Sequence, residues 1–475
     1  MIDRDHGTLI AVMALVALFY MALLPVVFRH LNPVTGDEPF YIMTAQSMVL
    51  DRDLDETNNY ANRDYEAFYP DDPLPASWQG WPAFPRTLPP HPATTERPGL
   101  YTKHGLGLSL LIAAPYKFAG RLGAVLVVML FAVLLAGQMF MLAREAGATG
   151  EVAALVALGL AIAMPIAPYA TLIFPEIPAA LLIVYAVRRL SAKNNNHWQW
   201  IATGAAVGFL PWLHQRFAVV SVVFAIAILL ELWRKRSFQV ASALVPIAAG
   251  GFSLLAYNHW LYGQLTQNVE DHAGFSGLTG TVNGAAGLLL DAQWGLLITA
   301  PVLIFGIAAL PHWFRANRRG ASLAIAAIAP YLIVVSAYKV WWGEWGPPAR
   351  YLVPVVPLLA GPLGAWISGA TRPQKLTAAG LWALGMALTV VGYAQPQRFY
   401  HHPDGLNKLY TTLGDAAGMD LAGKLVAFQP YAADTFTARV WWTTSMLLLL
   451  IATAYWINTH EQPPEQTRET TRTTD

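Results

Sequence analysis

The sequence predicts an all-α polytopic membrane protein, and three observations lead to this fold class. Hydrophobic residues make up 55% of the 475 positions and charged residues only 12%. The mean hydropathy is +0.40, whereas a soluble domain carries about 25% charged residues. The third observation is a series of long apolar runs. The first run, residues 9–28, has the length of about 20 residues that crosses a bilayer.

Counting runs of this kind predicts about twelve transmembrane helices. The first run lacks a strongly basic leader and a small-residue cleavage site, so it is expected to remain as the first helix. The other runs cover residues 121–143, 152–172, 177–190, 199–213, 217–233, 238–258, 294–313, 321–340, 351–368, 376–394 and 438–457.

Lysine and arginine residues in short loops predict the orientation, because they favour the cytoplasmic side. With the N-terminus in the cytoplasm, four inner loops are basic: Arg188, Arg189 and Lys193; Arg234, Lys235 and Arg236; Arg315, Arg318 and Arg319; Arg372 and Lys375. Residues 1–457 are then one transmembrane domain of an inner or plasma membrane. The polar tail 458–475 is expected to be disordered and cytoplasmic.

A long extracytoplasmic loop, residues 29–120, is predicted to follow the first span and to carry amphipathic interfacial helices. Residues 105–120 are too short to span and contain Pro115 and Lys117, so they are expected to lie in the outer interface. An earlier helix is predicted from apolar side chains at helical spacing: Tyr41, Ala45, Met48 and Val49.

The middle of this loop, residues 70–98, is rich in proline. Such a composition predicts an extended covering layer rather than a separate domain. Three aromatic residues are expected to anchor it at the membrane surface: Trp78, Trp81 and Phe84.

Two adjacent carboxylates, Asp37 and Glu38, directly follow the first predicted span. Neighbouring residues do not share a helix face, so the two are expected to have different tasks. A glycosyl transfer needs a carboxylate base for the acceptor hydroxyl and a neighbour that orients it. The alternative is a solvated loop pair, or a helix cap by Asp37 ahead of Pro39.

A third acid, Glu176, stands in a very short outer turn between two apolar runs, flanked by Pro175 and Pro178. An ionisable group at membrane depth is a functional candidate by default. The alternative is a turn carboxylate that faces the outer water.

Several cations on the predicted outer side could hold a lipid phosphate, which gains negative charge as its bond to a sugar breaks. They are Lys103, His104, His214, Arg216 and Arg350. Arg350 begins a span on the side where basic residues are rare, so it needs a partner or a task. In the alternative, Glu344 pairs with Arg350, and the neighbouring Trp341, Trp342 and Trp345 only anchor the chain at the interface.

The sequence favours neither a metal nor a nucleotide. His272, His401 and His402 stand alone in polar loops, and no spacing of His, Asp and Glu makes a preformed metal site. There is no phosphate-binding glycine loop, the net charge of +1 gives no case for nucleic acid, and cysteine is absent. No cofactor is therefore expected.

These features resemble the integral-membrane glycosyltransferases of the GT-C fold, such as protein O-mannosyltransferases and lipid A aminoarabinose transferases. The resemblance rests on the acidic pair after the first helix and on the lysine-glycine turn before the interfacial helix. Three later stretches also carry it: "NHWLYGQL" (258–265), "GLLLDAQWGLLITAPVLI" (287–304) and "WWGEWGPPARYLVPVVP" (341–357). It extends from the first helix to about residue 360.

The resemblance implies a polyprenyl-phosphate sugar donor, inverting transfer and an outward-facing cavity. The base of the family maps onto Asp37, with Glu38 as its companion, and the phosphate-binding residues map onto Lys103 and Arg350, with His104 beside them. The remaining site candidates are Tyr41, Glu176, Arg216 and Glu344. The chain departs from the family pattern in the late motif, with Glu344 for a glycine and Pro348–Ala349 for Gly–Pro, and His-Gly follows the lysine instead of Pro-Pro.

The leading interpretation is therefore a transferase that moves a sugar from a polyprenyl-phosphate carrier to an extracytoplasmic glycan, lipid or protein. A transporter or flippase of lipid-linked saccharides is the alternative from another class. It predicts polar residues in mid-span or broken helices in paired positions, whereas the runs here are apolar and the polar candidates gather on one face. A non-catalytic member of the same fold is the third possibility.

Overall fold

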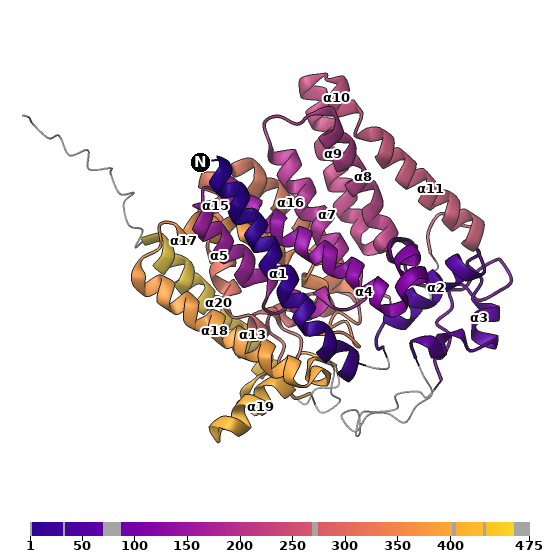
Figure 1. Cartoon of the computed structure of the whole chain (residues 1–475). Coiled ribbons are helices and arrows are strands. Elements are labelled where there is room, and N and C mark those ends of the chain that lie inside the picture. The colour runs from indigo at the N-terminus through magenta and orange to yellow at the C-terminus, as the bar shows by residue number, and fades with distance from the viewer. Residues whose placement is uncertain are drawn as a thin grey trace, which may run out of the picture.

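The structure, a computed structural model, describes residues 2–31, 34–69, 87–267, 274–400, 405–430 and 434–459. Within these ranges the chain is helical and holds no strand, only two isolated β-bridges. Figure 1 shows the helices gathered into one bundle. The predicted all-α membrane fold is thereby confirmed.

Seven helices of the described chain are long and apolar enough to cross a membrane. Their bounds are α1 (Ile2–His30), α4 (Leu106–Glu145), α9 (Ala218–Lys235), α11 (Leu244–Tyr262), α16 (Arg318–Ala337), α18 (Arg372–Ala394) and α20 (Phe436–Thr459). Two further predicted spans form shorter helices, α7 (Glu176–Ser191) and α8 (His197–Leu213). The predicted number of about twelve is therefore not confirmed.

Three predicted spans are interrupted, so the expectation of continuous helices there was wrong. Residues 152–172 form α5 (Gly150–Ala161) and α6 (Ile166–Ala170). Residues 294–313 form α13 (Leu296–Thr299), α14 (Leu303–Ala308) and α15 (Leu310–Ala316), and residues 351–368 begin as the 3₁₀ turns η5 (Arg350–Leu352) and η6 (Val356–Leu359) before α17 (Ala360–Ile367). Each interruption contains proline, which cannot donate to the helical ladder. Hydropathy measures apolar length and does not register this break.

The segment 105–120 is joined to the next span but remains distinct from it. Both belong to the long helix α4, yet Ala119 and Gly120 within it have non-helical backbone angles, with φ +56° at Gly120. Residues 106–118 are therefore a separate arm that meets the span at a kink. The separation was predicted, and the location of the arm in the membrane interface stays a prediction.

The helix after the acidic pair, α2 (Glu38–Leu50), is buried on every side through residue 47. It packs against the arm of α4, where the Ser109 hydroxyl donates to the Tyr41 carbonyl oxygen at 2.9 Å and the Tyr116 hydroxyl donates to Gln46 at 2.9 Å. The predicted helix is present, but it has no single apolar face, because it is buried on every side through residue 47; its position at the membrane interface stays a prediction. The segment that follows α2 contacts its polar side chains, since the Thr44 hydroxyl donates to Glu56 at 2.6 Å and the Ser47 hydroxyl donates to Asp53 at 2.9 Å.

Helices also form in segments that were predicted as outer loops. They are α3 (Thr57–Ala61), η1 (Asp64–Ala67), α12 (Leu278–Leu290), η7 (Pro396–Phe399), α19 (Lys408–Ala417) and η8 (Ala422–Lys424). The buried Asp291 carboxylate, at the end of α12, accepts hydrogen bonds from the Phe428 amide and the Gln429 side chain. This carboxylate ties the segment after α19 to the bundle.

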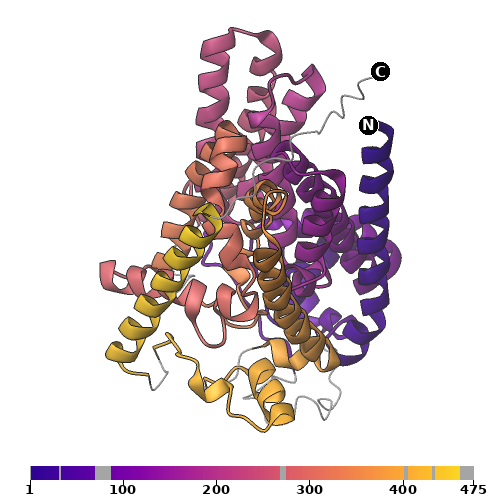
Figure 2. The same ribbon diagram turned by 90° about the vertical axis from the view of Figure 1, so that its left-hand side faces the viewer.

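The predicted inner ends of the helices meet at one end of the molecule. Arg144 pairs with Asp5 at 2.6 Å, and Arg319 pairs with Glu231 at 2.8 Å. The Arg315 guanidinium reaches Asn458, near the end of α20, at 3.0 Å. In Figure 2 the start of α1 lies at the opposite end of the bundle from α19.

Two short helices flank α9: η3 (Gln215–Phe217) precedes it and α10 (Phe238–Ala241) follows it.

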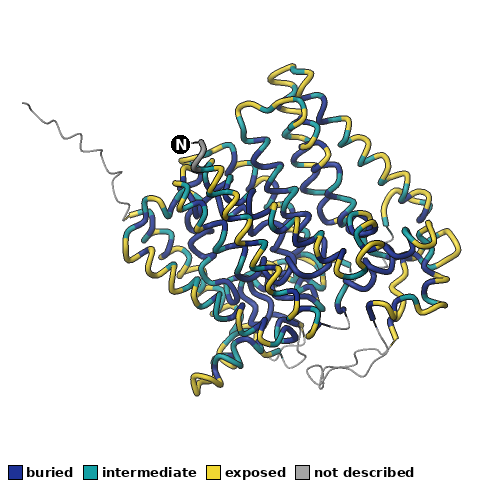
Figure 3. The backbone as a smooth tube through the Cα atoms, in the orientation of Figure 1, coloured by how far each residue is buried: buried dark blue, intermediate teal, exposed yellow. Residues whose placement is uncertain are grey.

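The outer flanks of the bundle are apolar and exposed, as helices in lipid require. Figure 3 shows buried residues along the middle of the bundle and exposed residues along its edges. On α20 three consecutive leucines, 447–449, are each at least half exposed. A surface of this kind in water would be an aggregation site, and in a bilayer it needs no further partner.

The orientation predicts a difference in labelling between two engineered cysteines, since the chain has no native cysteine. Asn62 and Asn194 are both exposed, in the first loop and between α7 and α8. On intact cells a membrane-impermeant maleimide is expected to label Asn62→Cys and to leave Asn194→Cys unlabelled until the membrane is opened. The reverse pattern would contradict an extracytoplasmic site.

A buried carboxyl group in the first loop predicts a pH-dependent stability. Glu56 is 3% exposed and contacts the Thr44 hydroxyl of α2 at 2.6 Å. Burial raises the pKa of Glu56 to about 8. The protonated form is therefore favoured by folding, and this stabilisation is present at low pH and is lost as the pH rises through about 8. The melting temperature should fall from pH 5 to pH 8, and Glu56→Gln should flatten that profile; parallel profiles would exclude Glu56 as the cause.

Candidate active site

Asp37 lies in the turn between α1 and α2 and points to Arg350. It occupies the position before α2, but its side chain makes no capping hydrogen bond. Instead its carboxylate forms an ion pair with the Arg350 guanidinium. The predicted alternative of a helix cap was therefore wrong for this side chain.

Gly36 allows the two loops that carry this pair to approach. Its φ is +63°, and a Cβ at this position would lie 2.1 Å from the Trp345 carbonyl oxygen. Only glycine meets both conditions, because other residues disfavour this backbone region and no side chain fits in that space. The contact places the loop that contains Trp345 and Arg350 directly against the turn of Asp37.

Glu176, the first residue of α7, is completely buried. One of its oxygens accepts from the Arg216 guanidinium at 2.7 Å and from Arg350 Nε at 3.0 Å. The carboxylate also stands at the positive end of a helix, which favours its charge. The alternative of a turn carboxylate in outer water was wrong.

Arg350 is 6% exposed and contacts three acceptors. The first two acceptors are Asp37 and Glu176. The third is the Gly343 carbonyl oxygen, to which Arg350 Nη1 donates at 3.2 Å. Ala349 directly before it has a φ of +59° and donates its amide to the Trp294 carbonyl oxygen at 3.0 Å. No ion pair joins Arg350 to Glu344 among the described residues. The alternative of a Glu344–Arg350 pair was thus wrong.

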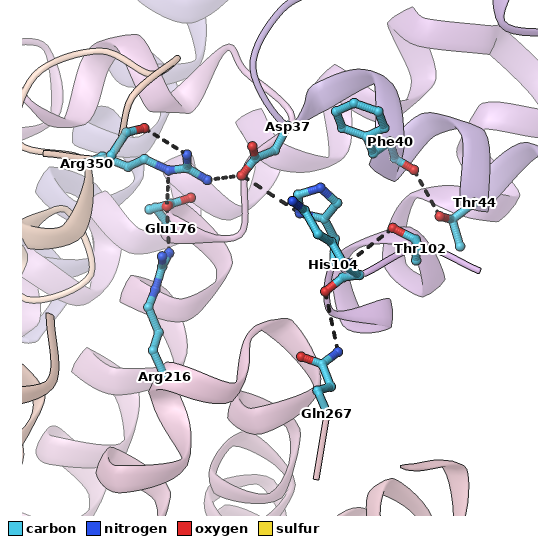
Figure 4. Close-up of polar contacts among 11 residues, drawn as sticks. Asp37, Phe40, Thr44, Thr102, His104, Glu176, Arg216, Gln267 and Arg350 are labelled. Atoms are coloured by element: carbon cyan, nitrogen blue, oxygen red, sulfur yellow. Dashed lines mark hydrogen bonds and ion pairs between the residues drawn. The ribbon is translucent and has the colours of Figure 1, made fainter. Parts of the chain in front are cut away.

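These contacts form one continuous chain of charges, Asp37, Arg350, Glu176 and Arg216, which Figure 4 shows. Two carboxylates and two guanidinium groups balance each other, as a buried ionic network requires. Asp37 is the exposed end, because its side chain is 25% accessible and that of Glu176 is 0% accessible. Asp37 and Arg350 are therefore the end of this ionic network that is open to a ligand.

A short hairpin before α4 supplies the other wall of the site. Its two sides pair through the Ala93 amide on the Tyr101 carbonyl oxygen at 2.7 Å and a bridge between Pro92 and Thr102. The hairpin thereby brings Lys103 to the wall of a cavity that Asp37 and Arg350 also line. Among the described residues, the Lys103 ammonium has no ion-pair partner, so it is available to an anion.

Two imidazoles and a phenyl ring stack behind Asp37. Phe40 lies 4.3 Å from the ring of His91 and 5.3 Å from that of His104, with nearly parallel planes. The His104 Nδ1 atom is 4.0 Å from Asp37. Burial lowers the pKa of His104 to about 4, although Asp37 opposes the shift, so this imidazole is neutral at physiological pH. His104 is then a hydrogen-bonding group rather than a fixed charge.

The charges around Asp37 set its proton affinity. Burial alone would raise the pKa of Asp37, but the charge and hydrogen bond of Arg350, together with contributions from His104 and His214, outweigh burial and hold that pKa well below the ordinary range. Asp37 is therefore ionised at physiological pH and able to accept a proton only when Arg350 gives up part of this contact.

Seven of the ten predicted site residues line one cavity of about 380 Å³: Asp37, Lys103, His104, His214, Arg216, Glu344 and Arg350. Glu176 lies behind the cavity wall as the anchor of the two arginines. Glu38 and Tyr41 do not line it. The sequence thus identified residues that the fold brings together from five separate segments of the chain.

Glu38 faces away from the cavity. It is completely buried, and its Oε2 atom accepts the Ile173 amide at 2.8 Å. Burial raises the pKa of Glu38, although the charge of Arg121 opposes the shift. The contact fixes the turn of Asp37 to the segment that leads into Glu176. Glu38 is thereby placed to position this turn, and Tyr41 lies deeper in the same helix.

A second, apolar cavity of about 330 Å³ adjoins the first between α9 and α16. The two share His214, Arg216, Tyr338 and Tyr351 in their walls. Apart from Gln215 and Gly274, the remainder of the second cavity is lined by apolar side chains: Val219, Phe275, Val334 and Val335. A polar chamber with cations thus continues into an apolar one.

Several residues of the site were not predicted from the sequence. His91, Tyr338 and Tyr351 line the cavity, and the Arg216 guanidinium lies 4.6 Å from the ring centre of Tyr351. Tyr351 follows Arg350 directly and could have been included on that ground. His91 gave no signal, because it stands in the proline-rich segment without a charged neighbour.

The described residues contain no group of three His, Cys, Asp or Glu side chains that could hold a metal ion. The isolated His272, His401 and His402 lie outside the described residues, as do Trp78, Trp81, Phe84 and the tail 460–475.

No protein-family model matches the chain, and no curated protein matches it. Among solved structures, it is similar to ArnT from Cupriavidus metallidurans bound to undecaprenyl phosphate, with 15% identity and a TM-score of 0.47 over 94% of this chain and 71% of the ArnT chain. It is also similar to the archaeal oligosaccharyltransferase AglB from Archaeoglobus fulgidus, in complex with an inhibitory peptide and a dolichol-phosphate. That match has 14% identity and a TM-score of 0.39 over 96% of this chain and 56% of the other.

Proposed function

We propose that the protein is a membrane glycosyltransferase that moves a hexosyl or pentosyl group from a polyprenyl-phosphate carrier to an acceptor on the extracytoplasmic face. The observation that carries the proposal is the Asp37–Arg350 pair, which places a carboxylate base and a phosphate-binding cation in direct contact at a cavity wall. Transfer of a sugar from a phosphate takes place at the anomeric carbon, where a base must take the proton of the acceptor and a cation must stabilise the leaving phosphate.

The two adjoining cavities support a lipid phosphate as the donor. The first presents Arg350 and Lys103, which suit a phosphate. The second is lined mainly by apolar side chains, which suit the first isoprene units of a polyprenyl chain. His214 and Arg216 lie on both, so the phosphate would stand where the polar and apolar chambers meet.

The reaction can be written as an inverting displacement. The acceptor oxygen forms a bond to the anomeric carbon, the carbon–oxygen bond to the phosphate breaks, and its electron pair leaves on the phosphate oxygen. Asp37 takes the proton of the acceptor hydroxyl. As Asp37 becomes neutral, Arg350 loses one anionic partner while the phosphate gains a charge, so the guanidinium can follow the charge from base to leaving group.

Glu176 supports this exchange without taking part in it. Its oxygen holds both Arg350 and Arg216, and it is completely buried. A phosphate can therefore displace Asp37 from Arg350 while the arginine keeps its position. Glu176 is a positioning residue, and Asp37 is the group that meets the acceptor.

The interrupted segments bear on the alternative of a flippase, since broken helices in paired positions are typical of transporters. Among the described residues, the interruptions hold no carboxylate at mid-span. They support the site loops instead, since Tyr169 of α6 donates to the Pro347 carbonyl oxygen at 2.6 Å. This contact favours an enzyme, in which rigid loops hold the reacting groups.

Binding of a lipid phosphate tests the proposed donor. Purified protein in nanodiscs is expected to bind undecaprenyl phosphate, and undecaprenol, which lacks the phosphate, much more weakly. Lys103→Gln should weaken the binding of the phosphate about 10- to 150-fold, since a charged hydrogen bond contributes about 1.5–3 kcal/mol. Lys424→Gln, on an exposed turn far along the chain, is the matched control. Equal binding of the alcohol and the phosphate would contradict the proposal.

A further inference from the structure

A third cavity lies away from the candidate active site, among α5, α17 and α18, which Figure 1 labels on the same side of the bundle. Its volume is about 500 Å³, within the usual range of ligand pockets of about 300–1,000 Å³. Its floor includes the buried Trp366 and the contact of Trp382 Nε1 with the Gly159 carbonyl oxygen at 3.0 Å.

This cavity opens toward the lipid-facing surface. Leu155 on one rim and Leu376 on the other are each 63% exposed. Because both helices have apolar outer flanks, the cavity is reached from the bilayer rather than from water. An occupant must therefore be apolar over most of its length.

One lining residue does not fit a purely apolar occupant. Lys375, in the first turns of α18, is the single charged group of the cavity wall. Arg372, the first residue of the same helix, is also exposed. Neither has a carboxylate within ion-pair distance in the part of the chain that the structure describes. Both belong to the basic loops that predict the cytoplasmic side.

We propose that this cavity binds an acyl chain of an anionic phospholipid, whose phosphate is held by Lys375 and Arg372. The apolar wall matches the chain, and the two unpaired cations at its inner end match the headgroup. The start of α18 adds a favourable dipole for an anion. A bound lipid would add contacts between α5 and α18 to the Trp382–Gly159 hydrogen bond that already joins them.

The proposal predicts selectivity for headgroup charge. The protein is delipidated, and phosphatidylglycerol or phosphatidylcholine with the same acyl chains is then added. Phosphatidylglycerol is expected to remain bound to a larger share of the protein in native mass spectrometry and to raise its melting temperature more. Lys375→Gln should weaken this binding about fivefold, since one cation near a membrane surface contributes about 1 kcal/mol. Lys424→Gln, outside the cavity, should leave it unchanged.

A second pair of variants tests whether the acyl chain enters the cavity. Ala379 lines the cavity, and Thr377 on the same helix does not. Ala379→Phe should reduce the retention of phosphatidylglycerol, whereas Thr377→Phe should not. Both lie far from the catalytic groups, so sugar transfer should persist in each. Equal retention of the two lipids, or unchanged retention in Ala379→Phe, would overturn the proposal.

Discussion

Asp37→Asn is expected to abolish sugar transfer while folding and donor binding persist. The amide has nearly the same shape as the carboxylate but cannot take the acceptor proton, and loss of a general base costs about 10²- to 10⁴-fold in rate. The donor should bind at least as tightly, because Arg350 loses the carboxylate that competes with the phosphate. The measurement is single-turnover transfer at matched expression and melting temperature.

Two further variants serve as controls for Asp37→Asn. Asp415→Asn, an exposed residue of α19, removes a carboxylate without touching the site and should transfer at the wild-type rate. Glu38→Gln should cost less than Asp37→Asn, because Glu38 holds the Ile173 amide and does not reach the cavity. A wild-type rate in Asp37→Asn would end its assignment as the base. An equal loss in both variants would mean that the position of the turn, rather than proton transfer, limits the rate.

Arg350→Ala is expected to produce the second large effect, a loss of donor affinity together with transfer. A hydrogen bond to a charged group contributes about 1.5–3 kcal/mol, so the dissociation constant of undecaprenyl phosphate should rise about 10- to 150-fold. Arg350→Lys should recover part of this, since a point charge replaces a planar fork. Binding and single-turnover transfer are measured on the same preparations.

The same substitution threatens the fold, because Glu176 is completely buried and loses one of its two cationic partners. Breaking such a pair costs about 3–5 kcal/mol. The double variant Arg350→Gln/Asp37→Asn removes both charges of the outer pair, leaves the Glu176–Arg216 pair intact and should restore much of the stability. If it folds and still binds the donor as the wild type does, Arg350 has only a structural role.

The membrane fold could be predicted because the length of each apolar run can be read directly from the sequence. The seven long helices follow directly from it. The interrupted segments could not be predicted in this way, because hydropathy does not report where proline removes a donor from the helical ladder. The burial of α2 could not be predicted for a related reason, since the arm of α4 that packs against it comes about seventy positions later in the chain.

The site was predictable as a set of charges and not as a network. Asp37, Glu176 and Arg350 each stood out because a charge beside an apolar run needs a reason. Their pairing depends on the approach of the Gly36 turn to the Trp345 loop, a contact between residues about three hundred positions apart. Sequence proximity instead suggested Glu344 for Arg350. His91 carried no charge pattern at all and became visible only through its stack on Phe40.

The proposed function requires that this chain breaks the bond between a sugar and a polyprenyl phosphate. The most direct test is a panel of radiolabelled undecaprenyl-phosphate sugars, both hexoses and pentoses, with the purified protein in lipid and an extract of envelope acceptors. We expect at least one sugar to leave the carrier with stoichiometric appearance of undecaprenyl phosphate, and Asp37→Asn not to support this reaction. If the intact donor only crosses the bilayer, with its sugar still attached, the protein is a transporter and the account is contradicted.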